Sequence, residues 1–140
     1  MGAGAKITDE VLDSFALLAY LGDEPGAAIV ERVLASAARG TSRAWMTLVN
    51  VGEVLYVTER HRGPNAARAV IALMDSLTIR VIDAGRELTF DAAHIKANHA
   101  LSYADAFAAA LARQLGATLI TGDPEFRCIE SLVRVKWLTA

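Results

Sequence analysis

The sequence lacks several features by which common classes of protein are recognised. It has one cysteine, Cys128, so no disulfide can form within the chain, as is usual in a reducing compartment. Its longest clearly apolar run, residues 15–21 (FALLAYL), is far too short to cross a bilayer. The first residues, MGAGAKITDE, contain no basic segment followed by an apolar one, which a secretory signal requires. We therefore expect a cytoplasmic protein that has no membrane partner.

The sequence also lacks an excess of positive charge. The formal net charge is −2, which argues against a protein that grips duplex phosphates over its whole surface. It leaves open an enzyme that handles RNA locally, through a metal ion and a few arginines. The segment MGAGAK does not have the GxxxxGK[ST] spacing of a phosphate-binding loop. Neither a nucleophile elbow nor a glycine-rich dinucleotide loop occurs elsewhere.

The histidines and the cysteine do not form a recognisable site. His94 and His99 are five residues apart, so they do not share one face of a helix as a zinc-binding pair would. His61 lies near an expected helix end, where a cation interacts favourably with the helix dipole. Cys128 has no evident histidine partner and is interpreted as a small core residue.

The sequence does contain the apolar residues needed for one packed domain. It has 140 residues, of which 54% are hydrophobic, and we expect a single domain over residues 1–140 with residues 1–8 as a frayed tail. Short strands are expected near residues 10–12, 45–48, 79–82, 118–121 and 133–137, with helical segments between them. Helix caps are expected at Ser14, Asn50 and Ser102, and Gly116 is expected to end a helix. This alternation predicts an α/β fold with a parallel sheet and helices on both faces.

Four acidic residues occupy unusual positions in this pattern. Asp13 follows the first expected strand, and Asp123 follows the fourth in the segment TLITGDPEF. Glu53 lies in the apolar segment VNVGEVLYV, and Asp105 lies in the first turn of the apolar helix LSYADAFAAALA. Taken one at a time, each has an ordinary structural explanation. Asn50 and Glu53, like Ser102 and Asp105, have the spacing of a capping box, and Asp13 and Asp123 fit turns.

Taken together, the four carboxylates favour a functional interpretation. The carboxyl ends of parallel strands meet at one edge of the sheet, where ligands bind at the reversal of strand order. Four carboxylates in one cleft would repel one another, and a divalent cation would remove that repulsion. Mg²⁺ and Mn²⁺ prefer carboxylate and water ligands. The chemistry suited to such a site is hydrolysis of a phosphodiester bond.

The same segments resemble a known family. VLDSFALLAYL, LVNVGEVLY, LSYADAFAAALARQLGATLITGDPEF and the closing VKWL are similar to PIN-domain ribonucleases, and most similar to VapC-type toxins of toxin–antitoxin systems. The resemblance extends from about residue 10 to residue 138, and residues 101–126 carry its most specific part. It implies a three-layer α/β/α sandwich with a central parallel sheet of about five strands.

The resemblance also implies an activity and a set of site residues. The family's catalytic carboxylates fall on Asp13, Glu53, Asp105 and Asp123, with Ser14 and Thr121 in supporting positions. Asp13, Asp105 and Asp123 are expected to bind Mg²⁺ or Mn²⁺ directly, and Glu53 either to bind the ion through water or to position the nucleophile. The implied activity is cleavage of RNA, and the implied partners are a small cognate antitoxin and a second copy of the chain. The sequence departs from the family at Phe15, which stands where a small residue is common, and in its polar first strand.

Other functions fit parts of the same pattern. A PIN-type nuclease of RNA processing or repair would have the same site but no antitoxin. A phosphoacceptor domain would also carry an aspartate at a strand end, but it needs a nearby lysine, and Lys6, Lys96 and Lys136 are poorly placed. A binding module with an acidic cluster and no turnover is the remaining alternative.

Overall fold

A sheet of five parallel strands forms the centre of the molecule, in the order β3-β2-β1-β4-β5. The structure is a computed structural model, and it describes residues 6–138 of the chain. The strands are β1 (Thr8–Leu12), β2 (Ser42–Thr47), β3 (Ile79–Ile82), β4 (Thr118–Thr121) and β5 (Arg134–Trp137).

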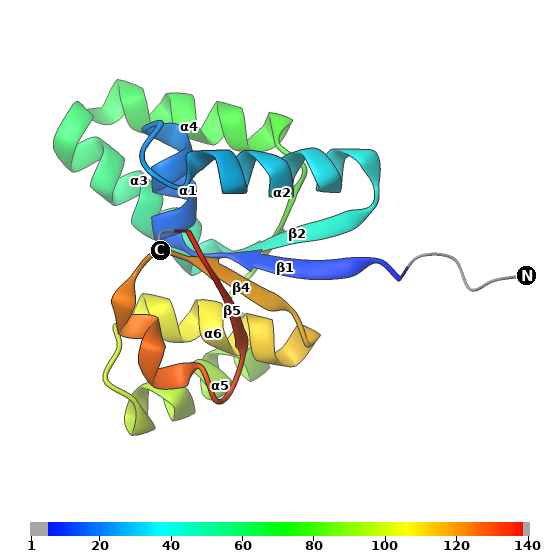
Figure 1. The fold of residues 1–140 in the computed structure, drawn as a ribbon. Helices are drawn as coiled ribbons and strands as arrows, with labels where there is room; N and C mark the ends of the chain where they lie inside the picture. The colour runs from blue at the N-terminus through cyan, green and yellow to red at the C-terminus, as the bar shows by residue number, and fades with distance from the viewer. Residues whose placement is uncertain (1–5, 139–140) are drawn as a thin grey trace, which may run out of the picture.

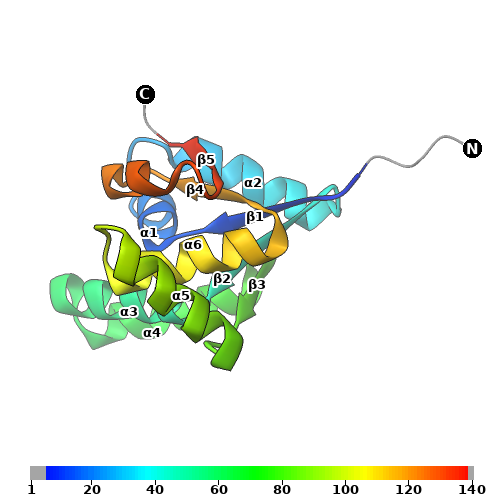
Figure 2. The same ribbon diagram turned by 90° about the horizontal axis from the view of Figure 1, so that it is seen from below.

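Helices cover both faces of the sheet (Figure 1). On one side lie α1 (Ser14–Leu21), α2 (Ala27–Arg39), α3 (Leu48–Arg62) and α4 (Pro64–Ser76). On the other side lie α5 (Arg86–Asn98) and α6 (Tyr103–Leu115), together with a short 3₁₀ helix, η1 (Pro124–Ile129) (Figure 2). This arrangement confirms the predicted three-layer α/β/α sandwich. No helix among residues 6–138 is long and apolar enough to cross a membrane.

The central strands β1 and β4 are buried on both faces. Val11 and Leu119 point into the core that contains residues of α5 and α6, and Leu12 and Ile120 point into the core that contains residues of α1 and α2. All four side chains have no exposed surface. Strands covered on both faces show continuous apolar runs rather than alternation, because neither face meets water. This burial explains the apolar pairs that precede Asp13 and Thr121 in the sequence.

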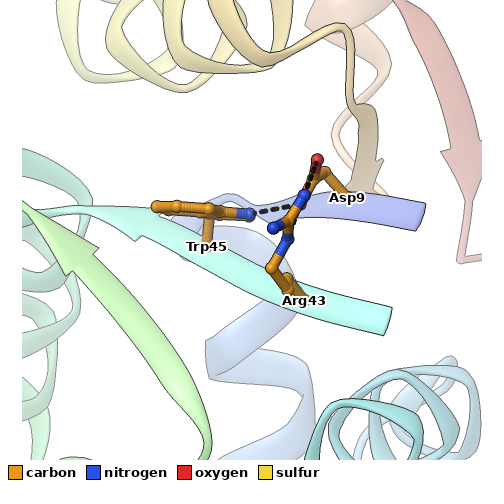
Figure 3. Close-up of polar contacts among 3 residues, drawn as sticks. All are labelled: Asp9, Arg43 and Trp45. Atoms are coloured by element: carbon orange, nitrogen blue, oxygen red, sulfur yellow. Dashed lines mark hydrogen bonds and ion pairs between the residues drawn. The ribbon is translucent and has the colours of Figure 1, made fainter. Parts of the chain in front are cut away.

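The polar start of β1 is held in the sheet by two contacts from β2. Asp9 lies opposite Arg43, and its Oδ1 accepts a hydrogen bond from Arg43 Nε at 2.7 Å. Trp45 Nε1 donates to the same oxygen at 2.9 Å (Figure 3). The hydrogen bond from Arg43 holds the pKa of Asp9 below its usual value. β1 therefore begins at Thr8, which lies within the expected tail, rather than at Glu10; residues 1–5 of that tail lie outside the described residues.

Two of the predicted helix caps are wrong. Asp13, not Ser14, caps α1, since its Oδ1 accepts a hydrogen bond from Ala16 N at 2.8 Å. Thr47, not Asn50, caps α3, because its hydroxyl accepts from Asn50 N at 3.1 Å. In both cases the residue that ends the strand or follows it directly caps the next helix, so strand and helix are joined without a loop.

The other two predicted helix boundaries are confirmed. The Ser102 hydroxyl caps α6 by accepting a hydrogen bond from Asp105 N at 3.1 Å. Gly116 ends α6 with a φ of 61°, in the left-handed region that glycine adopts without steric strain. The Ser102 cap fixes the first turn of α6, which carries Asp105.

Candidate active site

The carboxylate site lies where the order of the strands reverses. The chain runs from β1 outward through β2 to β3, and then continues on the other side of β1 with β4 and β5. In parallel α/β sheets a ligand-binding crevice forms at this reversal, outside the carboxyl ends of the strands. Asp13 directly follows β1, and Asp123 follows β4 after Gly122. The two aspartates therefore flank the crevice.

A cleft of about 290 Å³ occupies this position. The helices α1, α3 and α6 and the segment after β4 all contribute to its walls. The lining residues are Ser14, Phe15, Leu18, Glu53, Val57, Ser102, Asp105, Asp123 and Glu125. Three of the four predicted catalytic carboxylates, Glu53, Asp105 and Asp123, thus line one cleft, together with the predicted supporting residue Ser14.

Three carboxylates in the cleft lie close enough to share one cation. One oxygen from each of Asp105, Asp123 and Glu125 lies within 4.8 Å of the other two. Asp105 is buried, Asp123 is half-buried and Glu125 is exposed. Glu125 was not among the predicted site residues, although it stands two positions after Asp123 in the segment that marked the site. The signal that could have identified Glu125 from the sequence was an acidic side chain in the same turn as Asp123.

Asp13 lies beneath the cleft rather than on its surface. Its side chain is 1% exposed, and Oδ1 accepts from Ala16 N. Its Oδ2 accepts a hydrogen bond from the Thr121 hydroxyl, which in turn accepts from Asp123 N at 3.0 Å. Thr121 thus connects the carboxylate after β1 to the backbone of the carboxylate after β4.

Most of the sequence matches one family model. The model of the PIN domain matches residues 11–131. The chain belongs to the PIN domain family. No curated protein matches the sequence.

Solved structures show the same fold at low sequence identity. A chain of VapBC2 from Rickettsia felis, bound to a DNA fragment from its promoter, has a TM-score of 0.72 at 16% identity, over 92% of this chain and 98% of that one. A chain of DNA-bound VapBC from Salmonella typhimurium has a TM-score of 0.72 at 19% identity, over 94% and 99%. VapC20 of Mycobacterium tuberculosis, a toxin that cleaves the sarcin–ricin loop, has a TM-score of 0.67 at 22% identity, over 86% and 93%. The likeness extends over nearly the whole PIN domain.

Burial makes the carboxyl group of Asp13 a weak acid. Loss of solvent is the main cause that raises its pKa from 3.8 to about 7, and the negative charges of Asp123 and Glu53 raise it further. The hydrogen bonds from Thr121 and Ala16 N act in the opposite direction but are outweighed. A charge at this position is therefore unfavourable until something positive lies near it.

Asp105 is a still weaker acid. Burial raises its pKa from 3.8 to about 8, and Asp123, Asp13 and Glu125 add to the effect, while Ser102 opposes it. Two neighbouring carboxyl groups in this PIN domain thus have pKa values near or above neutrality. A divalent cation would stabilise their ionised forms, and clustered carboxylate oxygens are the ligands that Mg²⁺ and Mn²⁺ prefer. The residues present therefore fit such an ion.

A buried amide joins the three helices around the cleft. Asn50, in the first turn of α3, has no exposed surface. Its Nδ2 donates to Ala104 O in α6 at 3.1 Å and to Ser14 Oγ in α1 at 3.2 Å. Its Oδ1 accepts from the Thr47 hydroxyl, and its own carbonyl accepts from Ser14 Oγ at 3.2 Å. Asn50 therefore sets the spacing between the elements that carry Asp13, Glu53 and Asp105.

Proposed function

We propose that this PIN domain is a divalent-metal-dependent endoribonuclease, and that it is the toxin of a type II toxin–antitoxin pair. The observation that carries the proposal is the cleft at the strand reversal. It gathers Glu53, Asp105, Asp123 and Glu125 above the buried Asp13, with two pKa values raised to about 7 and about 8. Clustered carboxylate oxygens are the ligands that Mg²⁺ and Mn²⁺ prefer, and a bound ion would keep these buried groups in their ionised form.

Each residue has a distinct role in the proposal. Asp105, Asp123 and Glu125 would hold Mg²⁺ or Mn²⁺, and Asp13 adds negative charge beneath them. When bound, such an ion would supply a lowered pKa for water and neutralisation of charge on the leaving oxygen. Glu53, on the α3 wall of the cleft, orients the attacking water and accepts its proton. Thr121 holds Asp13 and Asp123 at a set distance from each other, because its hydroxyl donates a hydrogen bond to the carboxylate of Asp13 and accepts one from the backbone N of Asp123.

The test is cleavage of total RNA by the purified chain with Mg²⁺ or Mn²⁺, with and without a chelator. We expect cleavage with either metal, none with the chelator, and defined product ends. Asp123→Asn keeps the shape of the side chain but removes its charge, and we expect it to abolish cleavage. Asp75→Asn is the matched control, since Asp75 is exposed on α4 and does not line the cleft. Equal cleavage by Asp123→Asn and the wild type would refute the site assignment.

The toxin assignment rests on different support. Several solved structures of similar fold are complexes named VapBC, and one is a toxin that cleaves the sarcin–ricin loop. We propose by analogy a small cognate antitoxin and a cytoplasmic location. Induction of the chain alone should arrest growth of the host, and co-expression with a small protein that co-purifies with the native chain should relieve the arrest. RNA cleavage without growth arrest would instead indicate a PIN nuclease that acts without an antitoxin.

We also propose that the chain forms a homodimer. Large apolar side chains are exposed on α3 and α6: Leu48, Tyr56 and Tyr103 have exposed fractions of 48%, 52% and 46%. Exposed apolar side chains of this size are common at interfaces between subunits. The molecular mass in solution, measured by light scattering, would be twice that of one chain, and a monomeric mass would refute this proposal.

A further inference from the structure

Phe15 is an exposed aromatic residue in a cleft otherwise suited to a metal ion. It is the second residue of α1, directly after Ser14, and 38% of it is exposed. Its neighbours Ser14, Ala16 and Leu17 are buried, so Phe15 lies on the outward face of the helix. The phenyl ring cannot bind a cation through oxygen, and it is too exposed to serve mainly as core. Its presence beside the carboxylates therefore needs another explanation.

The ring lies against Gly122, which has no side chain to displace it. A Cβ atom added at Gly122 would lie 2.3 Å from Cε1 of Phe15 and 2.8 Å from its Cζ, so only glycine allows the ring to approach so closely. Gly122 does not have the positive φ that marks Gly26 and Gly116, so the turn does not require glycine for its backbone conformation. Space for the ring is the reason for glycine here. Because Gly122 lies between Thr121 and Asp123, the ring lies directly beside the carboxylate site.

The cleft offers few other contacts to a nucleic acid. Nine residues of the described part of the chain line it. Four of them are acidic, and none is Lys, Arg or His. No side chain that lines the cleft can therefore attract a phosphate group by opposite charge. A nucleobase, in contrast, is uncharged and can stack on an aromatic ring, and every base has a face for such stacking. A volume of about 290 Å³ is near the lower end for ligand pockets and suits a single nucleotide.

We infer that Phe15 is a base-stacking platform for the nucleotide beside the scissile phosphate, in single-stranded RNA. The inference rests on the proposed ribonuclease function and makes it more specific. Bases in a duplex already stack on their neighbours, so only an unpaired or splayed base can use the ring. Leu18 lines the same cleft one turn further along α1 and extends the apolar surface under the base.

The test compares Phe15 variants on a short single-stranded oligoribonucleotide that spans a cleavage site mapped in total RNA. Phe15→Leu keeps apolar bulk against Gly122 but removes the aromatic face. We expect KM to rise about tenfold with a smaller change in kcat, equivalent to about 1.4 kcal/mol of lost stacking. Phe15→Trp should restore KM. Phe90→Leu is the matched control, because Phe90 is 57% exposed on α5 and does not line the cleft.

Removing single bases from the RNA locates the contact. An abasic nucleotide at one position next to the cut should raise KM for the wild type about tenfold, and should raise it little further for Phe15→Leu, since the two changes remove the same interaction. An unchanged KM in Phe15→Leu, with the wild type active, would overturn the stacking role alone. A wild type that cleaves no RNA would overturn the proposed function, and the stacking role with it.

Two further outcomes would also overturn the inference. If Phe15→Leu lowers kcat and weakens the thermal stabilisation by Mg²⁺, the ring only supports the turn that holds Asp123. If the variant weakens inhibition by a co-expressed partner protein but leaves KM for RNA unchanged, the ring serves a protein contact. The unfolding temperature of each variant, measured with chelator, confirms that the comparison concerns folded protein.

Discussion

Replacement of Asp13 by asparagine should stabilise the metal-free protein while it destroys the proposed activity. Asp13 is 1% exposed, and burial raises its pKa from 3.8 to about 7. Asparagine has the same shape and is as good a helix cap as aspartate, so the hydrogen bond from Ala16 N can be kept. The substitution therefore removes the buried charge with little change in packing.

The size of the effect follows from the pKa. A carboxyl group with a folded-state pKa above its unfolded value binds its proton more tightly in the folded state. Its contribution to stability is fully present below about pH 4 and is lost as the pH rises through about 7. The shift of about 3 units corresponds to about 4 kcal/mol at about pH 8. In Asp13→Asn the Thr121 hydroxyl loses its charged acceptor, and this loss offsets about 1 kcal/mol of the gain in stability.

The assay is unfolding of chelated protein at about pH 8 and again at about pH 5. Asp13→Asn should gain about 3 kcal/mol at the higher pH, or about 10 °C in unfolding temperature for a domain of this size, and much less at the lower pH. Asp9→Asn is a control for which we expect a change in stability in the opposite direction. The pKa of Asp9 is lowered by Arg43, so its ionised form stabilises the fold and the control should destabilise it at about pH 8. A loss of stability in Asp13→Asn at about pH 8, or a gain independent of pH, would refute the account of Asp13 as a strained buried charge.

Three other predictions concern the metal and the support of the cleft. Mg²⁺ should raise the unfolding temperature more at about pH 8 than at about pH 6, because protons compete with the ion at Asp105 and neutralise Asp13 beneath it at the lower pH; equal shifts in a thermal unfolding series would contradict this. Glu125→Gln should lower the affinity for Mn²⁺ about tenfold or more in a calorimetric titration, and unchanged affinity would remove Glu125 from the donor set. Asn50→Ala should lower the free energy of unfolding by about 2–4 kcal/mol in urea, because it leaves buried partners on α1 and α6 unpaired; a change below about 1 kcal/mol would show that water replaces the amide.

Much of the fold could be predicted from local patterns. The strands β3 and β4 lie over the residues expected, since short apolar runs between helical segments have few other interpretations in a small α/β domain. The beginnings of β1 and β2 were placed too late, because their first residues are polar. Contacts between strands keep them in the sheet: Asp9 with Arg43 and Trp45. Such contacts join residues far apart in the chain, so no local pattern reveals them.

The candidate site, like the fold, could be predicted from the sequence only in part. Asp13 and Asp123 could be placed at one edge of the sheet from sequence alone, because the carboxyl ends of parallel strands always share an edge. The cap spacing suggested the wrong roles for Ser14 and Asn50. Both belong to a buried hydrogen-bond network that exists only when α1, α3 and α6 are packed together. Glu125 needed the turn of η1 to bring it to Asp105.

The sequence by itself determined the fold class, the positions of the carboxylates and the family, since each depends on residue type and spacing along the chain. The tertiary structure alone decided which carboxylates meet, how far each is buried, and hence which remain protonated near neutral pH. It also placed the ring of Phe15 against Gly122, a contact between residues more than a hundred positions apart. Burial and charge interactions depend on distances in space, and the packing of helices on the sheet sets those distances.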